Sequence, residues 1–168
     1  MKNDLKGELL STKDNLLRVL DSFSQHNINI VPFEGSWTAG QVARHILKSA
    51  SGVSDALMGP AKTAARDPGQ HLKLLGDIFL NFDIKMKSPD FVLPDDEPRD
   101  KVVLIRLLGE TFDSIVSVTE SEDLDVICTT FEMPNLGFLS KKEFIWFTIV
   151  HTQRHIHQLK NILDHLKE

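Results

Sequence analysis

The sequence is short of the features that mark several common classes of protein. Cys128 is its single cysteine, which excludes an intrachain disulfide. Lysine and arginine number 19 against 24 acidic residues and are scattered along the chain, so no basic surface is predicted for nucleic acid or for an anionic membrane. The most apolar stretch, residues 144–150, is far too short to span a bilayer, and residues 1–6 lack the apolar core of a signal peptide. These absences predict a soluble protein of the reducing cytoplasm, with neither nucleic acid nor a membrane as its partner.

What the sequence contains is typical of one globular domain. Hydrophobic residues make up 41% and charged residues 26% of the 168 positions, which is enough for one core and little for two. We therefore expect a single domain over residues 1–168. A homodimer formed through one helix face is compatible with this length, and so is a monomer.

Apolar residues recur at steps of three and four in long segments, which predicts amphipathic helices. The segments are 4–24, 38–58, 100–119 and 140–166, and the pattern allows a shorter helix over 70–82. Capping boxes mark two of the starts, at Thr38 with Gln41 and at Ser140 with Glu143. The expected inward positions are Leu5, Leu9, Thr12, Leu16, Val19 and Phe23, then Val42, His45, Ile46, Ser49 and Val53, and then Val103, Leu104, Leu107, Leu108, Thr111, Ile115 and Val118.

The remaining segments show no convincing strand alternation, and we expect 121–139 to be irregular. The fold class predicted is therefore all-α, a four-helix bundle. Its two long connections are able to cross the end of the bundle, so the pattern leaves the order of helix directions open.

Two histidines in the last helix indicate a possible metal site. His151 and His155 are one turn apart, which places both imidazoles on one face, within reach of a shared ion. A helical wheel puts them on the same stripe as Phe144, Phe147 and Ile162. Neutral imidazoles buried on such a stripe need partners for their nitrogens, and a metal ion satisfies two of them at once. The alternative is a pair of core histidines bonded to the backbone or to other side chains.

His45 supplies a plausible third ligand, because it falls on the inward face of the second helix. Arg154 and Gln158 flank the histidine pair and could orient a ligand, an anionic substrate or a water, although a solvated Arg154 is equally compatible with the pattern. Trp37, just before the second helix, fits either a pocket wall or ordinary core packing.

The other histidines are expected to lie outside this site. His157 points away from His151 on the helical wheel, towards solvent. His165 returns to the inner face but sits roughly 15 Å beyond His155 along the axis, too far to share an ion. His26 and His71 fall in or near loops. Cys128 has no basic neighbour in sequence that would lower the pKa of its thiol, which favours a structural role.

Several short stretches together resemble one known family. They are Ser36-Trp37-Thr38 before the second helix, His45 eight positions after the tryptophan, and His151-x-x-x-His155 followed by Gln158-Leu159. In these features the chain resembles the DinB/YfiT-like superfamily of bacterial four-helix-bundle metalloproteins. The resemblance implies an up-down-down-up bundle in which His45, His151 and His155 bind one divalent metal. It also implies one of several roles: a metal-dependent hydrolase, a transferase that uses a small thiol such as bacillithiol or mycothiol, or a damage-induced protein without catalytic activity.

Three neutral imidazoles would leave Zn²⁺ or Ni²⁺ with its full charge and an open coordination position. Two reactions on a small-molecule substrate are then available, attack by a bound thiol or hydrolysis by a bound water. A zinc protease of the HExxH type is excluded, because Thr152 stands where its glutamate is needed. Hydrolysis lacks an evident general base, so thiol transfer is favoured. The third possibility is a metal-binding or stress-response protein that catalyses nothing.

Overall fold

The computed structural model describes residues 2–121 and 123–167. Along the chain the elements are α1 (Lys2–Asp21), the 3-10 turn η1 (Asn27–Asn29), α2 (Ala39–Met58), β1 (Ala61–Lys62), α3 (Leu72–Phe79), the 3-10 turn η2 (Asp90–Val92), α4 (Lys101–Ser121), β2 (Ile127–Met133), β3 (Gly137–Ser140) and α5 (Lys141–His165). The prediction of a mainly helical fold is confirmed.

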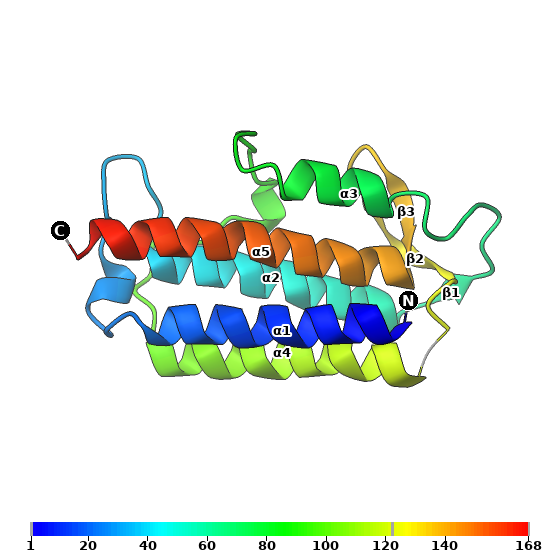
Figure 1. Cartoon of the computed structure of the whole chain (residues 1–168), viewed down its shortest axis with the longest axis horizontal. Coiled ribbons are helices and arrows are strands. Elements are labelled where there is room, and N and C mark those ends of the chain that lie inside the picture. The colour runs from blue at the N-terminus through cyan, green and yellow to red at the C-terminus, as the bar shows by residue number, and fades with distance from the viewer. Residues whose placement is uncertain (1, 122, 168) are drawn as a thin grey trace.

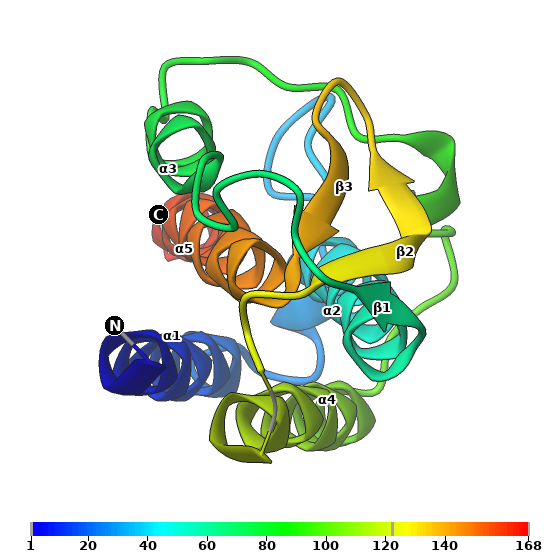
Figure 2. The ribbon, with the colours of Figure 1, turned by 90° about the vertical axis from the view of Figure 1, so that its right-hand side faces the viewer.

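The helices α1, α2, α4 and α5 form a bundle. α1 packs on α4 and α5, and α2 packs on the same two helices from the other side, so the four occupy the corners of a square when viewed end-on (Figure 2). α1 and α5 run in one direction and α2 and α4 in the other, which gives the order up, down, down, up (Figure 1). Within the described residues, every helix is too short or too polar to cross a bilayer.

The bundle core is built from the stripes that the sequence predicted. All six predicted inward positions from Leu5 to Phe23 are buried, the last of them just beyond the end of α1. The largest fully buried side chains include Phe23, together with Phe112 of α4 and Phe144 of α5. Burial of one such ring stabilises the fold by about 1.5–3 kcal/mol. Val103 is an exception, since its side chain is 43% exposed. It lies in the first turn of α4 at the edge of the stripe, one helical step from the buried Leu104, and so faces outward.

Both predicted capping boxes are present, and they fix where α2 and α5 begin. Thr38 Oγ1 accepts from the backbone N–H of Gln41, while the Gln41 side chain accepts from the N–H of Thr38. Ser140 and Glu143 make the same pair of bonds at the start of α5. Because side-chain direction follows the helical period, a fixed first turn also fixes which residues of each helix face the bundle interior.

The prediction of an irregular 121–139 segment was wrong, because β2 and β3 form a hairpin at one end of the bundle (Figure 2). β1 adds to β2, with Ala61 paired to Cys128. The chain reverses between Met133 and Gly137 through Asn135, whose φ is 66°, and Gly137 itself has a φ of 75°. The first two side chains of β2 are both buried and only the last five alternate between partly buried and exposed, so the period-two signal in the sequence is short.

α3 is shorter than the 70–82 span that the pattern allowed, and it lies against α5 outside the bundle (Figure 1). The Trp146 indole N–H of α5 donates to the carbonyl of Leu72 at 2.9 Å and so holds the start of α3. From the end of α3 the chain crosses to η2, which contacts α2, and then continues to α4. This crossing segment passes beside the histidines described next.

Candidate metal centre

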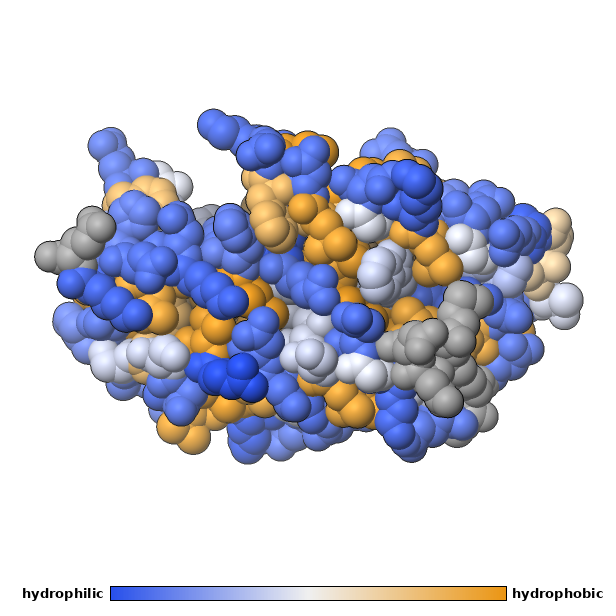
Figure 3. Space-filling view, viewed as in Figure 1, coloured by the Kyte–Doolittle hydropathy of each residue, from blue (hydrophilic) through white to orange (hydrophobic). Residues whose placement is uncertain are grey.

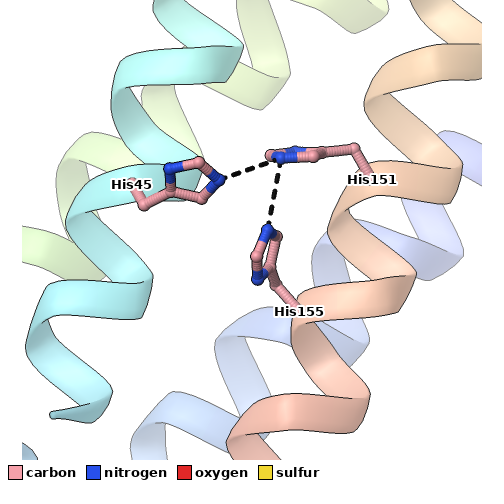
Figure 4. A group of neighbouring side chains, drawn as sticks. All are labelled: His45, His151 and His155. Atoms are coloured by element: carbon pink, nitrogen blue, oxygen red, sulfur yellow. Dashed lines mark hydrogen bonds between the residues drawn. The ribbon is translucent and has the colours of Figure 1, made fainter. Parts of the chain in front are cut away.

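His45, His151 and His155 come together in the bundle interior. His45 lies in the second turn of α2 and the other two lie on α5, and the three rings point toward one another (Figure 4). His151 Nε2 is 3.0 Å from His45 Nε2 and 3.2 Å from His155 Nε2. The side chains are buried, with 2%, 7% and 9% of their surface exposed in chain order. The three positions that the sequence selected therefore form one cluster able to hold a metal ion.

The hydrogen bonds on the far side of two rings fix their tautomers. His45 Nδ1 lies 2.9 Å from the carbonyl oxygen of Val92, which only accepts, so this nitrogen carries the proton. His155 Nδ1 lies 2.8 Å from Gln158 Oε1, an acceptor as well. A neutral imidazole has one N–H, so both Nε2 atoms present a lone pair to the cluster. His151 Nε2 can offer at most one proton, and at least one close nitrogen pair stays poorly satisfied without a cation.

Burial keeps these imidazoles neutral. It is the main cause that lowers the pKa of His151 well below 6.5, and the neighbouring His155, His45 and Arg154 add to the effect as positive charges. The pKa of His155 falls to about 3, again chiefly through burial. Burial also lowers the pKa of His45, although its bond to the Val92 carbonyl acts in the opposite direction. Neutral imidazole is the form that coordinates metals, so the cluster is ready to bind at ordinary pH.

Aromatic rings surround the cluster and limit water around it. The Phe147 ring stacks on His151 with centroids 5.1 Å apart, and Phe79 meets the same imidazole edge-on at 5.8 Å. The half-buried Trp37 lies 5.4 Å from the His45 ring. The sequence left two roles open for Trp37, a wall of the site and core packing. Its ring does both, because it lies beside His45 and also packs against the bundle core. These apolar walls lower the local dielectric and strengthen any charge interaction inside.

The two expected flanking residues behave differently. Gln158 contacts a ring of the cluster, because its Oε1 accepts from His155. Arg154 instead turns to the segment after α3, where its guanidinium donates to the carbonyls of Phe79, Asn81 and Ile84. Its donors are thus engaged by backbone oxygens, which leaves the expectation of an anion-binding Arg154 without support in this geometry.

The remaining candidates lie outside the cluster. His157 is exposed and its ring stacks on Phe82, with centroids 4.2 Å apart. The inner-face placement of His165 was wrong, because this residue is exposed near the end of α5 and its ring meets Phe33. The helix has by then run past the buried part of the bundle. Cys128 is buried, and burial raises the pKa of its thiol, which agrees with a structural role.

Sequence reasoning missed Val92 and Phe79. The Val92 carbonyl orients His45, yet a backbone oxygen leaves no mark in a sequence, and residues 60–99 carried no transferable motif. Phe79 follows the apolar pattern of α3, but nothing in that pattern showed that α3 would dock beside His151.

The donor set fits a divalent transition metal. Zinc binds imidazole nitrogen at about 2.0–2.1 Å in tetrahedral geometry, which implies nitrogen–nitrogen separations of roughly 3.3 Å. The two Nε2 distances to His151 are 3.0 and 3.2 Å, and all three ligand atoms lie within 4.8 Å of one another. Both of these distances lie within a few tenths of an ångström of the expected value, and the separation between the ligand atoms of His45 and His155 is at most 4.8 Å.

A family model describes nearly the whole chain. The model of the DinB superfamily matches residues 8–159. The chain belongs to the DinB superfamily. That match includes the three histidines and Gln158, so the DinB-like resemblance drawn from these positions is confirmed at the level of the family. The chain has no match among curated proteins, and none among solved structures.

Proposed function

We propose that this DinB-superfamily protein is a metal-dependent enzyme that transfers a low-molecular-weight thiol to an electrophilic small molecule. His45, His151 and His155 would hold one divalent ion, with zinc or nickel as the best candidates for an all-imidazole site. The observation that carries the proposal is the convergence of three buried Nε2 atoms, two of them fixed as lone-pair donors by bonds on the opposite side of the ring.

When bound, the ion would supply an undiminished positive charge and an open coordination position, which lowers the pKa of a thiol beside it. The protein's own residues would then act on geometry and solvent. Val92 and Gln158 hold the orientation of His45 and His155, and the rings of Phe79 and Phe147 keep water from His151. Their positions favour a reaction in a dry, preorganised site.

The surroundings of the triad favour thiol transfer over hydrolysis. Among the residues that the structure describes, no carboxylate makes a hydrogen bond or ion pair with His45, His151 or His155. Thr152, at the position of the catalytic glutamate of HExxH proteases, is buried and its hydroxyl has no hydrogen-bond partner. Hydrolysis requires a base to take a proton from water, whereas a thiol of low pKa loses its proton to buffer.

The burial of the triad also supports a second candidate, a metal-binding protein that senses metal and has no catalytic activity. None of the three rings is more than 9% exposed, which is closer to the closed surroundings of a structural site than to an open catalytic one. The two candidates differ in whether an external thiol reaches the ion, and this difference is measurable.

The test begins with elemental analysis of protein purified without chelators. About one zinc or nickel per chain is expected, and His151→Ala should remove it. The second step incubates the loaded protein with cysteine, glutathione or bacillithiol and with chlorodinitrobenzene, and follows the thioether product. His26→Ala is the matched control, because it removes an exposed histidine that belongs neither to the triad nor to α5. Metal without turnover would favour the sensor, and equal turnover in wild type and His151→Ala would overturn the transferase.

A further inference from the structure

Residues 79–93, here called the strap, run from the end of α3 to just beyond η2. They contact both α5 and α2, the two helices that carry the triad. In Figure 1 the segment leaves α3, passes α5 near its middle and reaches η2 behind it. Figure 3 shows the surface hollowed beside this projecting segment, between it and a second projection that corresponds to the loop before α2. The strap contacts the triad at both of its ends, through the Val92 carbonyl on His45 and the Phe79 ring on His151.

One end of the strap is held to α5 by side chains alone. The Arg154 guanidinium donates to the carbonyl of Asn81 at 2.9 Å, and also contacts those of Phe79 and Ile84. The ring of Phe82 stacks flat on His157, one turn further along α5, with an interplanar angle of 4°. Neither Arg154 nor His157 is a member of the triad, and Phe79 meets the triad only through the edge-on contact of its ring with His151. This end can therefore be released without loss of a ligand.

The other end of the strap is held to α2 by a ligand itself. His45 Nδ1 donates to the carbonyl of Val92, and Lys48 Nζ donates to the carbonyl of Leu93 at 2.6 Å, one turn further along the helix. Release of this end would leave the buried N–H of His45 without an acceptor, which costs the desolvation of that group. The two ends therefore differ in what their opening would disturb.

We propose that the strap controls access to the triad by opening at its α5 end, and that Arg154 is the positioning residue that holds that end closed. This inference rests on the proposed function in one respect: the species that enters and leaves the triad is the metal ion. Arg154 lies one residue from His155 in sequence, but its guanidinium donates its hydrogen bonds to strap carbonyls, so these bonds act on the path to the site. Lys48 and His45 keep the α2 end in place as a hinge.

The experiment uses Arg154→Lys, which keeps the positive charge beside the triad but has no planar fork to bridge several carbonyls. Arg106→Lys is the matched control, since Arg106 is exposed on α4 and pairs with Glu110. Stopped-flow mixing with Co²⁺ gives the rate of metal uptake, and mixing of the loaded protein with EDTA gives the rate of release. Loss of one charge-assisted hydrogen bond changes an equilibrium by roughly tenfold, so Arg154→Lys should raise both rates about tenfold.

Because both rates rise together, the dissociation constant for Co²⁺ should stay within about twofold of the wild-type value. The shape of the Co²⁺ absorption spectrum should be unchanged. Unchanged rates would overturn the proposal. A shifted spectrum or a weakened equilibrium affinity would also overturn it, because either shows that Arg154 shapes the site itself.

Hydrogen exchange of the metal-free protein separates this inference from the proposed function. The backbone N–H of Ile84 is bonded to the carbonyl of Asn81 within the strap. Its exchange should be about tenfold faster in Arg154→Lys than in wild type or Arg106→Lys. If exchange is faster in Arg154→Lys but the wild-type protein binds no metal, the strap opens as proposed while the proposed metal function fails. Unchanged exchange, or faster exchange with unchanged metal rates, overturns the control of access.

Discussion

The role of Gln158 gives the sharpest test of the proposed metal centre. Its Oε1 is the acceptor for His155 Nδ1 at 2.8 Å and so holds the imidazole proton on the side away from the cluster. In Gln158→Leu this acceptor is lost while the size of the side chain is nearly kept. The proton can then move to Nε2, where it blocks coordination, or stay on Nδ1 without a partner in a side chain that is 9% exposed.

The expected loss follows from the cost of either outcome. Removal of the hydrogen-bond partner of a metal-binding histidine lowers metal affinity by about 10–100-fold, equivalent to roughly 1.4–2.8 kcal/mol. Gln158→Glu should act in the opposite direction. A carboxylate accepts a stronger, charge-assisted bond from Nδ1 and makes the imidazole a better donor to the metal, so affinity should rise by a few-fold.

Competition with a chromophoric chelator at fixed pH measures both effects on Zn²⁺ affinity. Gln153→Leu is the matched control, because Gln153 is half-buried on the same helix and bonds to Thr12 and not to the triad. Its affinity should equal that of wild type. If Gln158→Leu also bound zinc as wild type does while His155→Ala lost the ion, the fixed tautomer would be irrelevant and the reasoning refuted.

Three further predictions concern stability, each measured as an unfolding free energy in urea. In the metal-free protein, the unfolding free energy should fall as pH drops below 6.5, by at most about 1.4 kcal/mol per pH unit for each proton. The reason is that the pKa of His155 in the folded protein is about 3, so between these pH values only the unfolded chain binds the proton. His155→Gln should flatten this slope. Glu143→Gln should cost about 2 kcal/mol, because the buried carboxylate accepts hydrogen bonds from Arg66 and from the backbone. Burial alone would raise the pKa of Glu143, but these bonds lower it, so the loss should be seen at pH 7 and fade as pH falls through the carboxyl range. Gly137→Ala should cost about 1 kcal/mol, because Gly137 has a φ of 75° although no atom would clash with an added Cβ. Gly52→Ala, on the exposed face of α2, should instead stabilise the protein by about 0.5–1 kcal/mol, and equal effects of the two substitutions would contradict the argument from backbone conformation.

Much of the bundle could be predicted because helix signals are local. The boxes at Thr38 and Ser140 marked the starts of α2 and α5 to the residue, since both bonds of a capping box lie within four positions. The hairpin could not be predicted in the same way. Side-chain alternation covers only the last five residues of β2, and the register of β2 against β3 is a property of two segments together.

The sequence could predict the candidate site only as far as helical periodicity brings residues of one helix to one face. The spacing of His151, His155 and Gln158 was sufficient to place them together, and an inward His45 was readable on α2. The contact between the two helices was not readable from their periods, and it entered through the family resemblance. The strap carried no signal, because its bonds to His45, Lys48 and Arg154 all end on backbone carbonyls, which every residue type provides.

The metal-free cluster carries a conflict that only a cation resolves well. A proton shared between two Nε2 atoms would relieve their repulsion, but burial lowers the pKa of all three histidines, so protons are scarce in the cluster at neutral pH. Rotation of His45 or His155 away from the cluster would break the bond to Val92 or Gln158. A divalent ion accepts all three lone pairs without disturbing either bond. Its binding should therefore stabilise the contact of α2 with α5, and the bonds that Val92 and Gln158 make to the rings, more than the rest of the bundle.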